Sequence, residues 1–342
     1  MHTTAQCDGS SRGIAVLISV VIPTHNRADL LLEAVASVAA QTLGTVELVV
    51  VDDGSSPPVD RQAIEGTFSG PLQLIHHQTA LGVPSAKNAG IRAAQGEVIV
   101  LLDDDDLLTE DALEVIAEGF STHPHLDCIF MGVEPFGPYA EGPAASRKAA
   151  MDALFQAAPP RPSGPLWLFD HSLFDALIPR VPIDFQRPAA RRGAWNVIGP
   201  FDEHSLFSES TWTKKAAALC ALAVTRVPIN HWRIHGKNFG WPEGLSVAAA
   251  QRRQVHNEIL AGANLLEAVR DTQQTWRRRE SALRRHQSQL LFTRAYQLRT
   301  HDWANGWAAL WQAFRLRATV SQLKLAVRYA LTMPRKTTDS RD

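Results

Sequence analysis

Four short apolar runs alternate with amphipathic segments near the start of the chain, and this alternation limits the fold more than any other feature. Ile14–Ile22 and Val46–Val51 predict two buried strands, and Leu72–His76 and Glu97–Leu102 predict a third and a fourth strand. Between them, Ala28–Gln41 carries apolar residues at spacings of three and four, as an amphipathic helix does. Pro84–Ala94 begins with the proline that suits a first helical turn. Strands alternating with helices predict an α/β fold with an open, mostly parallel sheet flanked by helices.

Three of the predicted strands end in polar clusters. These clusters are Pro23–Arg27, Asp52–Ser56 and Asp103–Asp106. The carboxyl ends of parallel strands meet at one edge of the sheet, and open α/β sheets bind their ligands there. We therefore expect the three clusters to form one binding site.

The composition divides the chain into four regions. Residues 1–13 are polar and are expected to form a flexible leader, and residues 14–125 hold the alternating pattern. Residues 126–242 mix short strands, prolines and tryptophans, which predicts a second lobe on the same sheet. Residues 243–342 are rich in Ala, Leu, Gln and Arg and poor in Gly and Pro, which predicts a C-terminal all-helical extension.

The composition also excludes several classes of protein. Apolar residues make up 45% of the chain and charged residues 20%, as in a globular protein rather than a disordered or fibrous one. Three cysteines lie far apart, which excludes a disulfide framework or a cysteine zinc site and suits a reducing compartment. The longest apolar stretches have nine residues, and a membrane-spanning helix needs about 20. We expect a cytoplasmic protein.

The cluster Asp103–Asp106 predicts a metal site. Four adjacent carboxylates repel one another unless a cation lies among them, and hard oxygen ligands suit Mg²⁺ or Mn²⁺. If the strand pleat continued, Asp103 and Asp105 would share one side and Asp106 would turn at the loop. The alternative is a solvated acidic turn in which Asp106 and Thr109 cap the next helix.

Four sequence blocks, in order and in spacing, resemble the family 2 glycosyltransferases of the GT-A fold. The blocks are Ile18–Arg27, Glu47–Ser55, Gly82–Gly90 and Gly96–Asp106. The resemblance implies a GT-A type, Rossmann-like sheet and an enzyme that takes a nucleoside-diphosphate sugar. It makes residues 14–125 the nucleotide-sugar-binding half and residues 126–242 the acceptor-binding half. The acceptor would be a glycan, a lipid-linked molecule or a small molecule.

The resemblance also implies roles for single residues. The nucleotide sugar would be bound by residues of all four blocks: Pro23, Thr24, His25, Asn26, Arg27, Asp52, Asp53, Lys87, Asn88, Asp103, Asp104 and Asp105. Asp53 would accept a hydrogen bond from the base, which favours uridine or thymidine, and Lys87 would approach the pyrophosphate. A divalent cation, Mn²⁺ or Mg²⁺, would be held against the diphosphate by Asp103, Asp105, Asp106 and His235.

The catalytic base is less clear from the sequence, because Ser210 stands where the family has an aspartate. The candidates are Glu209, one residue away, and Asp202 or Glu203 in the preceding turn. If none of them acts, the chain would be a non-catalytic subunit that binds a sugar nucleotide. Arg233-Ile234-His235 resembles the Arg-x-His of the family, although His231 is an alternative to His235 as the extra metal ligand.

The end of the chain is basic: residues 270–342 hold 15 Lys and Arg against 5 Asp and Glu. Trp303, Trp307 and Trp311 recur every four residues there, which suits one face of a helix. One interpretation is a basic amphipathic helix pair that contacts an anionic membrane surface at the cytoplasmic face. The other is that the tryptophans pack on the catalytic lobe and the arginines are solvated. No recognition motif supports nucleic acid as a partner.

Overall fold

The computed structural model describes residues 17–203, 208–235, 276–298 and 302–331. The predicted leader (1–13) and the first part of the predicted helical extension (243–275) lie outside these residues. Nine strands form one sheet, in the spatial order β3 (Leu72–His76), β2 (Val46–Asp52), β1 (Ile18–Thr24), β4 (Val98–Leu101), β10 (Pro188–Arg191), β6 (Cys128–Phe130), β11 (Leu222–Thr225), β9 (Leu166–Leu168) and β8 (Arg161–Ser163). A smaller sheet consists of β5 (Leu107–Leu108), β12 (Asn230–Arg233) and β7 (Val133–Phe136).

All four apolar runs form strands of the main sheet, as the sequence predicts. β3, β2, β1 and β4 are parallel, and every residue of β1 and β2 is buried. Such burial explains the unbroken apolar runs, because helices cover both faces. The alternative in which Asp106 and Thr109 cap the helix after the acidic cluster is wrong. That helix begins at Ala112, and the Thr109 hydroxyl donates to the carboxylate of Asp111 (2.7 Å).

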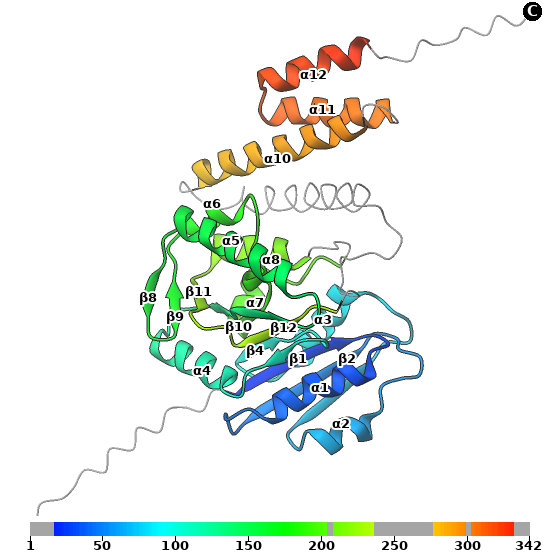
Figure 1. Cartoon of the computed structure of the whole chain (residues 1–342), viewed down its shortest axis with the longest axis vertical. Coiled ribbons are helices and arrows are strands. Elements are labelled where there is room, and N and C mark those ends of the chain that lie inside the picture. Colours follow the sequence, from blue (N-terminus) through cyan, green and yellow to red (C-terminus); the bar gives the residue numbers. More distant parts are fainter. Residues whose placement is uncertain (1–16, 204–207, 236–275, 299–301, 332–342) are drawn as a thin grey trace, which may run out of the picture.

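Helices cover both faces of the main sheet, so the main domain has three layers (Figure 1). One face is covered by α1 (Ala28–Ala39), α2 (Arg61–Thr67) and α4 (Ala112–Thr122). The other is covered by α3 (Val83–Ala93), α5 (Glu141–Ala157), α6 (Ser172–Leu177), α7 (Arg192–Ile198) and α8 (Ser208–Leu219). The α/β fold with a mixed, largely parallel open sheet is confirmed, and the one sheet runs through both predicted halves.

Close packing of α3 on the sheet depends on a glycine. A Cβ on Gly90 would lie 2.2 Å from Cγ1 of Val21 in β1 and 3.1 Å from Cγ2 of Val51 in β2. Any larger residue would therefore push α3 away from the strands. This contact matters for the site, because α3 carries Lys87 and Asn88.

Strand β10 of the second half is antiparallel to both of its neighbours. β10 is antiparallel to β4 on one side and to β6 on the other, so its first residues lie at the carboxyl edge of β4. The short 3₁₀ helix η1 (Ile183–Gln186) precedes it, and Arg187 joins the two. The antiparallel direction therefore delivers Arg187 to the edge where the acidic cluster follows β4.

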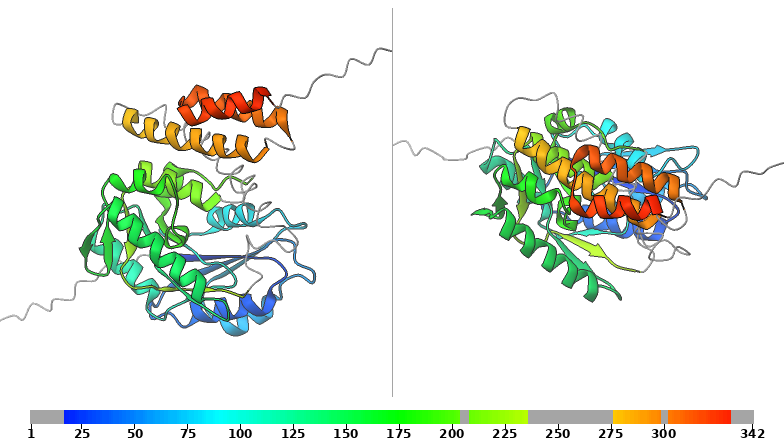
Figure 2. Two further views of the ribbon diagram at one scale, coloured as in Figure 1. Left: turned by 45° about the horizontal axis from the view of Figure 1, so that its top comes forward. Right: turned by 90° about the horizontal axis from the view of Figure 1, so that it is seen from above.

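Three helices, α10 (Trp276–Leu298), α11 (Trp303–Leu316) and α12 (Val320–Leu331), form a separate layer beyond α5, α6 and α8 (Figure 2). They have their own small core, and Leu283 of α10 joins the core of the main domain. Trp303 and Trp307 stack on each other (5.8 Å between ring centroids) and contact Tyr329 of α12, so this pair packs within the helical layer rather than on the catalytic lobe. No helix in the described part of the chain is long and apolar enough to cross a bilayer.

The contact between α10 and the main domain predicts a pH-dependent stability. Burial, together with the charge of Lys214, lowers the pKa of His286 in α10 to about 4. Below pH 6.5 the unfolded chain holds a proton on this ring that the folded chain does not, so the free energy of unfolding falls as the pH falls towards 4. Urea unfolding of the wild type and of His286→Gln at pH 7 and 4.5 should differ in this pH dependence by about 2 to 3 kcal/mol. The exposed His125 offers the control, since His125→Gln should unfold like the wild type; equal pH dependence in all three proteins would contradict the prediction.

Candidate active site

The carboxyl edge of β1 and β2 opens into a pocket of about 320 Å³. Its lining comes from all four sequence blocks: Pro23, Thr24, His25, Arg27, Asp53, Ala80, Gly82, Val83, Ala86 and Asp104. Six of the residues predicted to bind the nucleotide sugar thus share one cavity, although they lie up to 81 positions apart in the chain. The pairing of β1 with β2 and β4 brings them together.

Asp52 and Asp53 have different surroundings. Asp52 is buried and accepts hydrogen bonds from the backbone N–H groups of Ser55 and Val59, so it orders the loop after β2. Asp53 lines the pocket, and its Oδ1 accepts from Leu81 N–H (2.9 Å) and pairs with Nδ1 of His77 (2.7 Å). Its Oδ2 accepts from Gly82 N–H (2.7 Å). Asp53 is therefore fixed in the pocket by the loop that leads into α3.

Asn26 and Asn88 hold loops in place. Asn26 has a left-handed backbone (φ 54°), and its side-chain carbonyl accepts from Ser56 N–H (2.8 Å), which ties the end of β1 to the loop after β2. Asn88 exchanges two hydrogen bonds with the backbone of Phe201 (2.9 and 3.0 Å) and donates to Glu203 (2.9 Å). Asn88 therefore anchors the segment of the second half that carries two candidate bases.

The cluster Asp103–Asp106, which we call the acidic turn, does not continue the strand pleat. β4 ends at Leu101, and Asp106 N–H donates to the carbonyl of Asp103 (3.1 Å), so the four residues turn. Asp103 and Asp105 consequently face different partners, contrary to the expectation that they share one side. Asp104 instead faces the pocket and accepts from the Thr24 hydroxyl (2.7 Å).

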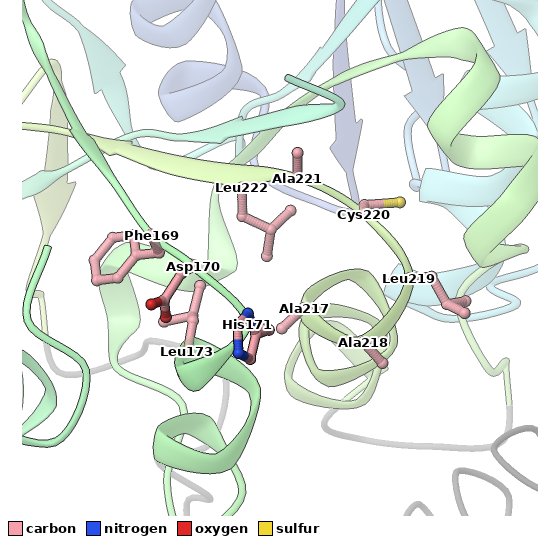
Figure 3. Close-up of a pocket in the computed structure, with 10 residues that line it drawn as sticks. All are labelled: Phe169, Asp170, His171, Leu173, Ala217, Ala218, Leu219, Cys220, Ala221 and Leu222. Atoms are coloured by element: carbon pink, nitrogen blue, oxygen red, sulfur yellow. The ribbon is translucent and has the colours of Figure 1, made fainter. Parts of the chain in front are cut away.

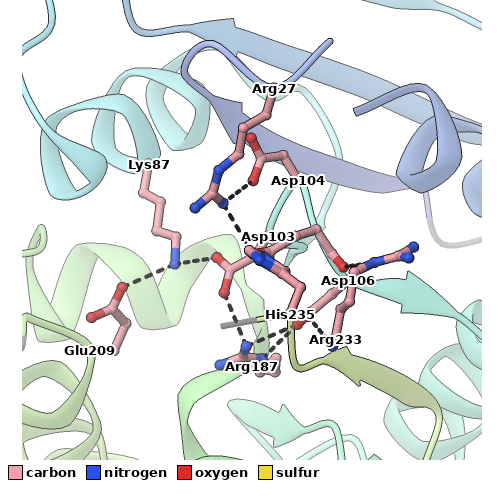
Figure 4. Close-up of polar contacts among 10 residues, drawn as sticks. Arg27, Lys87, Asp103, Asp104, Asp106, Arg187, Glu209, Arg233 and His235 are labelled. Carbon is pink, nitrogen blue, oxygen red and sulfur yellow. Dashed lines mark hydrogen bonds and ion pairs between the residues drawn. The ribbon is translucent and has the colours of Figure 1, made fainter. Parts of the chain in front are cut away.

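Basic side chains surround the acidic turn (Figure 4). Arg27 Nη1 lies 3.0 Å from both Asp104 and Asp105, and Arg187 Nη2 lies 3.1 Å from Asp103 and 2.8 Å from Asp106. The acids are buried or half-buried, so these cations are needed to balance their charge. The acidic turn is therefore not a simple solvated loop.

Lys87 connects the acidic turn to the second half of the domain. Its ammonium group lies 2.8 Å from Asp103 and 3.0 Å from Glu209, and only 3% of its side chain is exposed (Figure 4). Burial opposes the charge, but the two carboxylates outweigh burial and hold the pKa of Lys87 above its ordinary value. Lys87 is thus a fixed positive charge at the inner end of the site.

Burial and the neighbouring cations shift the pKa values of Asp103 and Asp106 in opposite directions. Burial opposes ionisation of Asp103, but Lys87 and Arg187 outweigh it and hold the pKa of Asp103 below its usual range. Burial raises the pKa of Asp106, which is fully enclosed, against the opposing effect of Arg187. Asp106 also accepts from Arg233 N–H (3.1 Å) on its other oxygen, so both of its oxygens are engaged within the protein.

Of the two histidines that the sequence left open, only His235 reaches the acidic turn. Its Nε2 lies 3.1 Å from Oδ2 of Asp105. His231 instead packs edge-on against Phe136 (6.1 Å between ring centroids). Arg233, which lies between the two histidines in the sequence, donates to the carbonyl of Asp105 (2.9 Å) and so helps to hold the acidic turn in place.

The predicted metal ligands are only partly brought together. Within the described ranges, no group of three His, Cys, Asp or Glu side chains converges on one point, so the four predicted metal ligands do not come together. Asp105 and His235 do come together, and a carboxylate oxygen beside an imidazole nitrogen suits Mn²⁺ in chemistry. Of the four predicted ligands, Asp105 and His235 thus form one carboxylate–imidazole pair, whereas Asp106 is directed at Arg187.

The three candidate bases occupy different positions. Glu209, in the first turn of α8, is 19% exposed and contacts Lys87, which in turn contacts the acidic turn. Glu203 accepts hydrogen bonds on both oxygens, from Ser85 (2.8 Å) and Asn88 (2.9 Å). Asp202 is half-buried beside Phe201. Glu209 is thus joined to Asp103 of the acidic turn through Lys87.

Sequence reasoning missed two residues of the site, Arg187 and His77. Arg187 is separated from the acidic turn by 81 positions, and no motif marks it. His77 directly follows β3, so the rule that polar residues at strand ends gather at one edge could have found it.

A second cavity, of about 330 Å³, lies at the opposite edge of the sheet, where β9 ends and β11 begins (Figure 3). Apolar residues and Cys220 dominate its lining between α6 and α8. Burial and the nearby Asp127 raise the pKa of Cys220 to about 12, so its thiol is protonated and a poor nucleophile. This cavity lacks the chemistry of the first.

Part of the chain is similar in sequence to known glycosyltransferases. The family model "Glycosyl transferase family 2" matches residues 19–176. The glycosyltransferase GlyG of Streptococcus pneumoniae is 35% identical over 103 residues, which are 29% of this chain and 34% of GlyG. The first curated relatives match over only 34–38% of their own length.

Two solved structures share the fold at low sequence identity. TarS 1–349 of S. aureus, in complex with UDP-GlcNAc, has a TM-score of 0.54 at 18% identity and covers 91% of this chain and 79% of its own. The mannosyltransferase PcManGT of Pyrobaculum calidifontis, in complex with GDP-Man and Mn²⁺, has a TM-score of 0.53 at 18% identity and covers 93% of this chain and 81% of its own. Residues 19–176 therefore match glycosyl transferase family 2, and the fold is of the GT-A type that these solved structures share.

Proposed function

We propose that the protein transfers a sugar from a nucleoside-diphosphate sugar, with UDP or dTDP as the nucleotide, to a hydroxyl group of a glycan, glycolipid or natural product. The observation that carries the proposal is the single path from Asp53 through the pocket to the acidic turn and Lys87. A base, a diphosphate and a sugar can lie along it in that order. UDP-GlcNAc and GDP-Man in the structures of TarS and PcManGT support a sugar nucleotide as the ligand class.

Asp53 is proposed to select the base. A carboxylate offers about four acceptor positions. The described contacts of Asp53 use two on Oδ1 and one on Oδ2, which leaves Oδ2 able to accept the ring N–H of uracil or thymine. The fixed geometry of Asp53 means that little ordering is needed on binding.

Arg27 and Lys87 are proposed to bind the diphosphate. Arg27 lines the pocket and is half-buried, while Lys87 is buried deeper and stays charged. A guanidinium fork and a point charge both suit phosphate oxygens. When the diphosphate enters, it competes with the carboxylates for these cations.

Asp105 and His235 are proposed to hold Mn²⁺ or Mg²⁺. Displacement of Arg27 from Asp105 by the diphosphate would leave that carboxylate with His235 as its neighbour. A bound divalent cation acts as a Lewis acid that neutralises the charge developing on the departing diphosphate.

Glu209 is proposed to be the base that takes the proton from the acceptor hydroxyl. In the structure its Oε1 contacts Lys87, and a diphosphate bound by Lys87 would free this carboxylate. An activated hydroxyl that attacks the anomeric carbon opposite the diphosphate inverts the configuration there, which is the stereochemistry implied by the family resemblance. The alternative, a binding subunit without turnover, rests on Ser210 at the position where the family has its aspartate.

Thermal unfolding with a panel of nucleotides tests the proposal. We expect UDP or dTDP with Mn²⁺ or Mg²⁺ to raise Tm, and GDP to raise it less; a ligand at 100 times its Kd adds about 2.7 kcal/mol. In Asp105→Ala the metal-dependent part of the shift should disappear while the metal-free shift remains. Prolonged incubation with the matching nucleotide sugar should release the nucleoside diphosphate, UDP or dTDP.

Two other results would reject parts of this proposal. A Tm shift without any release of the nucleoside diphosphate, with or without acceptors, would favour the binding subunit. The absence of a shift with every nucleotide would reject a sugar-nucleotide site altogether.

A further inference from the structure

The helix α12 is apolar on two opposite faces. Its inner face holds Leu325 and Tyr329, which are buried against α10 and α11. Its outer face, which we define as Val320, Leu323, Lys324 and Val327, is solvent-exposed: the three aliphatic side chains are 71%, 59% and 55% exposed. These residues fall on one side of the helix because they are spaced three, four and seven apart. A soluble helix normally turns a polar face to solvent, so the outer face of α12 calls for an explanation.

The three-helix layer projects the outer face of α12 away from the catalytic lobe. α10 lies nearest the main domain, and α12 lies on the far side of α11 (Figures 1 and 2). Trp311 of α11 is also 60% exposed, whereas Trp303 and Trp307 contact Tyr329 inside the layer. A flat object could contact α12 without meeting the catalytic lobe first.

The charge around this surface is strongly positive. Exposed basic side chains on and beside α12 are Arg315, Arg317, Lys324 and Arg328. The described residues 302–331, which form α11, α12 and their linker, contain four Lys and Arg against one acid. That acid, Asp302, caps α11. The partner must therefore offer both an apolar environment and negative charge.

We propose that the outer face of α12 binds the surface of an anionic lipid bilayer. The aliphatic side chains enter the boundary between headgroups and acyl chains, while Lys324 and its basic neighbours contact lipid phosphates. Aliphatic residues gain little from nucleic acid, and a symmetric contact between two copies would set basic residues against basic residues. The helix lies in the interface plane, consistent with the lack of a spanning helix in the described part of the chain.

Vesicle flotation of the full-length protein tests the proposal. Vesicles of phosphatidylcholine with 30–40% phosphatidylglycerol (about one anionic lipid in three) should carry the protein upward at low ionic strength, and pure phosphatidylcholine vesicles should carry far less. Leu323→Gln combined with Val327→Gln should reduce the partition coefficient at least about tenfold, because two aliphatic side chains no longer enter the bilayer. Lys324→Glu should reduce the partition coefficient by about tenfold, and raised salt should likewise weaken the binding of the wild-type protein to anionic vesicles.

The chain offers a matched control on the catalytic lobe. Val197 and Val227 are 61% and 67% exposed, so Val197→Gln with Val227→Gln removes as much exposed apolar surface and should leave flotation unchanged. All variants should keep the wild-type Tm and nucleotide binding, because the replaced side chains are exposed. Failure of the wild type to float with anionic vesicles would overturn the proposal, as would equal loss in the control variant. A Leu323→Gln and Val327→Gln protein that floats normally but loses an oligomer in sedimentation would instead assign the outer face of α12 to a second copy.

Discussion

Glu209→Gln is expected to lower kcat for sugar transfer by about 10²- to 10⁴-fold, the usual contribution of a positioned general base. Glutamine keeps the size of the side chain and can still accept a hydrogen bond from Lys87, but it cannot take a proton. Lys87 also keeps its ion pair with Asp103 (2.8 Å), so nucleotide affinity should change little. The measurement is kcat and donor KM with the nucleotide sugar that gives the largest Tm shift.

Glu203→Gln is the matched control. Its carboxylate already accepts from Ser85 and Asn88, so the amide should disturb loop packing more than chemistry. We expect less than tenfold loss in kcat. If Glu209→Gln kept kcat within threefold while Glu203→Gln or Asp202→Asn abolished turnover, the base would lie in the turn before α8. A variant of Glu209 that weakened nucleotide binding and left kcat unchanged would make Glu209 a positioning residue for Lys87.

The strands around the nucleotide pocket could be read from the sequence because their signal is local. β1, β2 and β4 are buried on both faces and are therefore largely apolar, whereas β3 is half-buried, and the polar ends of the buried strands mark the binding edge. The second half has no such pattern. β10 is short and reads Pro-Ala-Ala-Arg, and its place between β4 and β6 follows from long-range pairing that neither periodicity nor composition encodes.

The site was predictable in its residue types but not in its pairings. The acidic turn, Lys87 and Asp53 stand out because carboxylates and a lysine interrupt apolar context at strand and helix ends. The alternation rule failed after Leu101, because the chain leaves the strand two residues before the first acid. Asp52 is also an aspartate and directly precedes Asp53, yet it orders a loop. Only the hydrogen bonds of the folded chain separate the two roles.

Arg187→Met is expected to lower the free energy of unfolding by about 3 to 5 kcal/mol, the usual result of removing one partner from a buried ion pair. Arg187 is 7% exposed and bridges Asp103 and Asp106. Methionine fills a similar volume, so the loss comes mainly from carboxylates left without their cation rather than from a cavity. Urea unfolding followed by circular dichroism measures the change. Arg187→Lys should lose less, because it restores the charge without the fork that reaches both acids.

A double-mutant cycle with Asp106→Asn shows whether the loss has this origin. Asp106 is fully buried, and its second oxygen accepts from Arg233 N–H, a bond that an asparagine carbonyl can keep. If Arg187 mainly neutralises Asp106, then Arg187→Met should cost much less in the Asp106→Asn background than in the wild type, with a coupling of about 1 to 3 kcal/mol. Additive losses would mean that Arg187 stabilises the fold through its packing beside β10. The size of the coupling therefore separates a charge that holds the acidic turn in shape from a side chain that fills space.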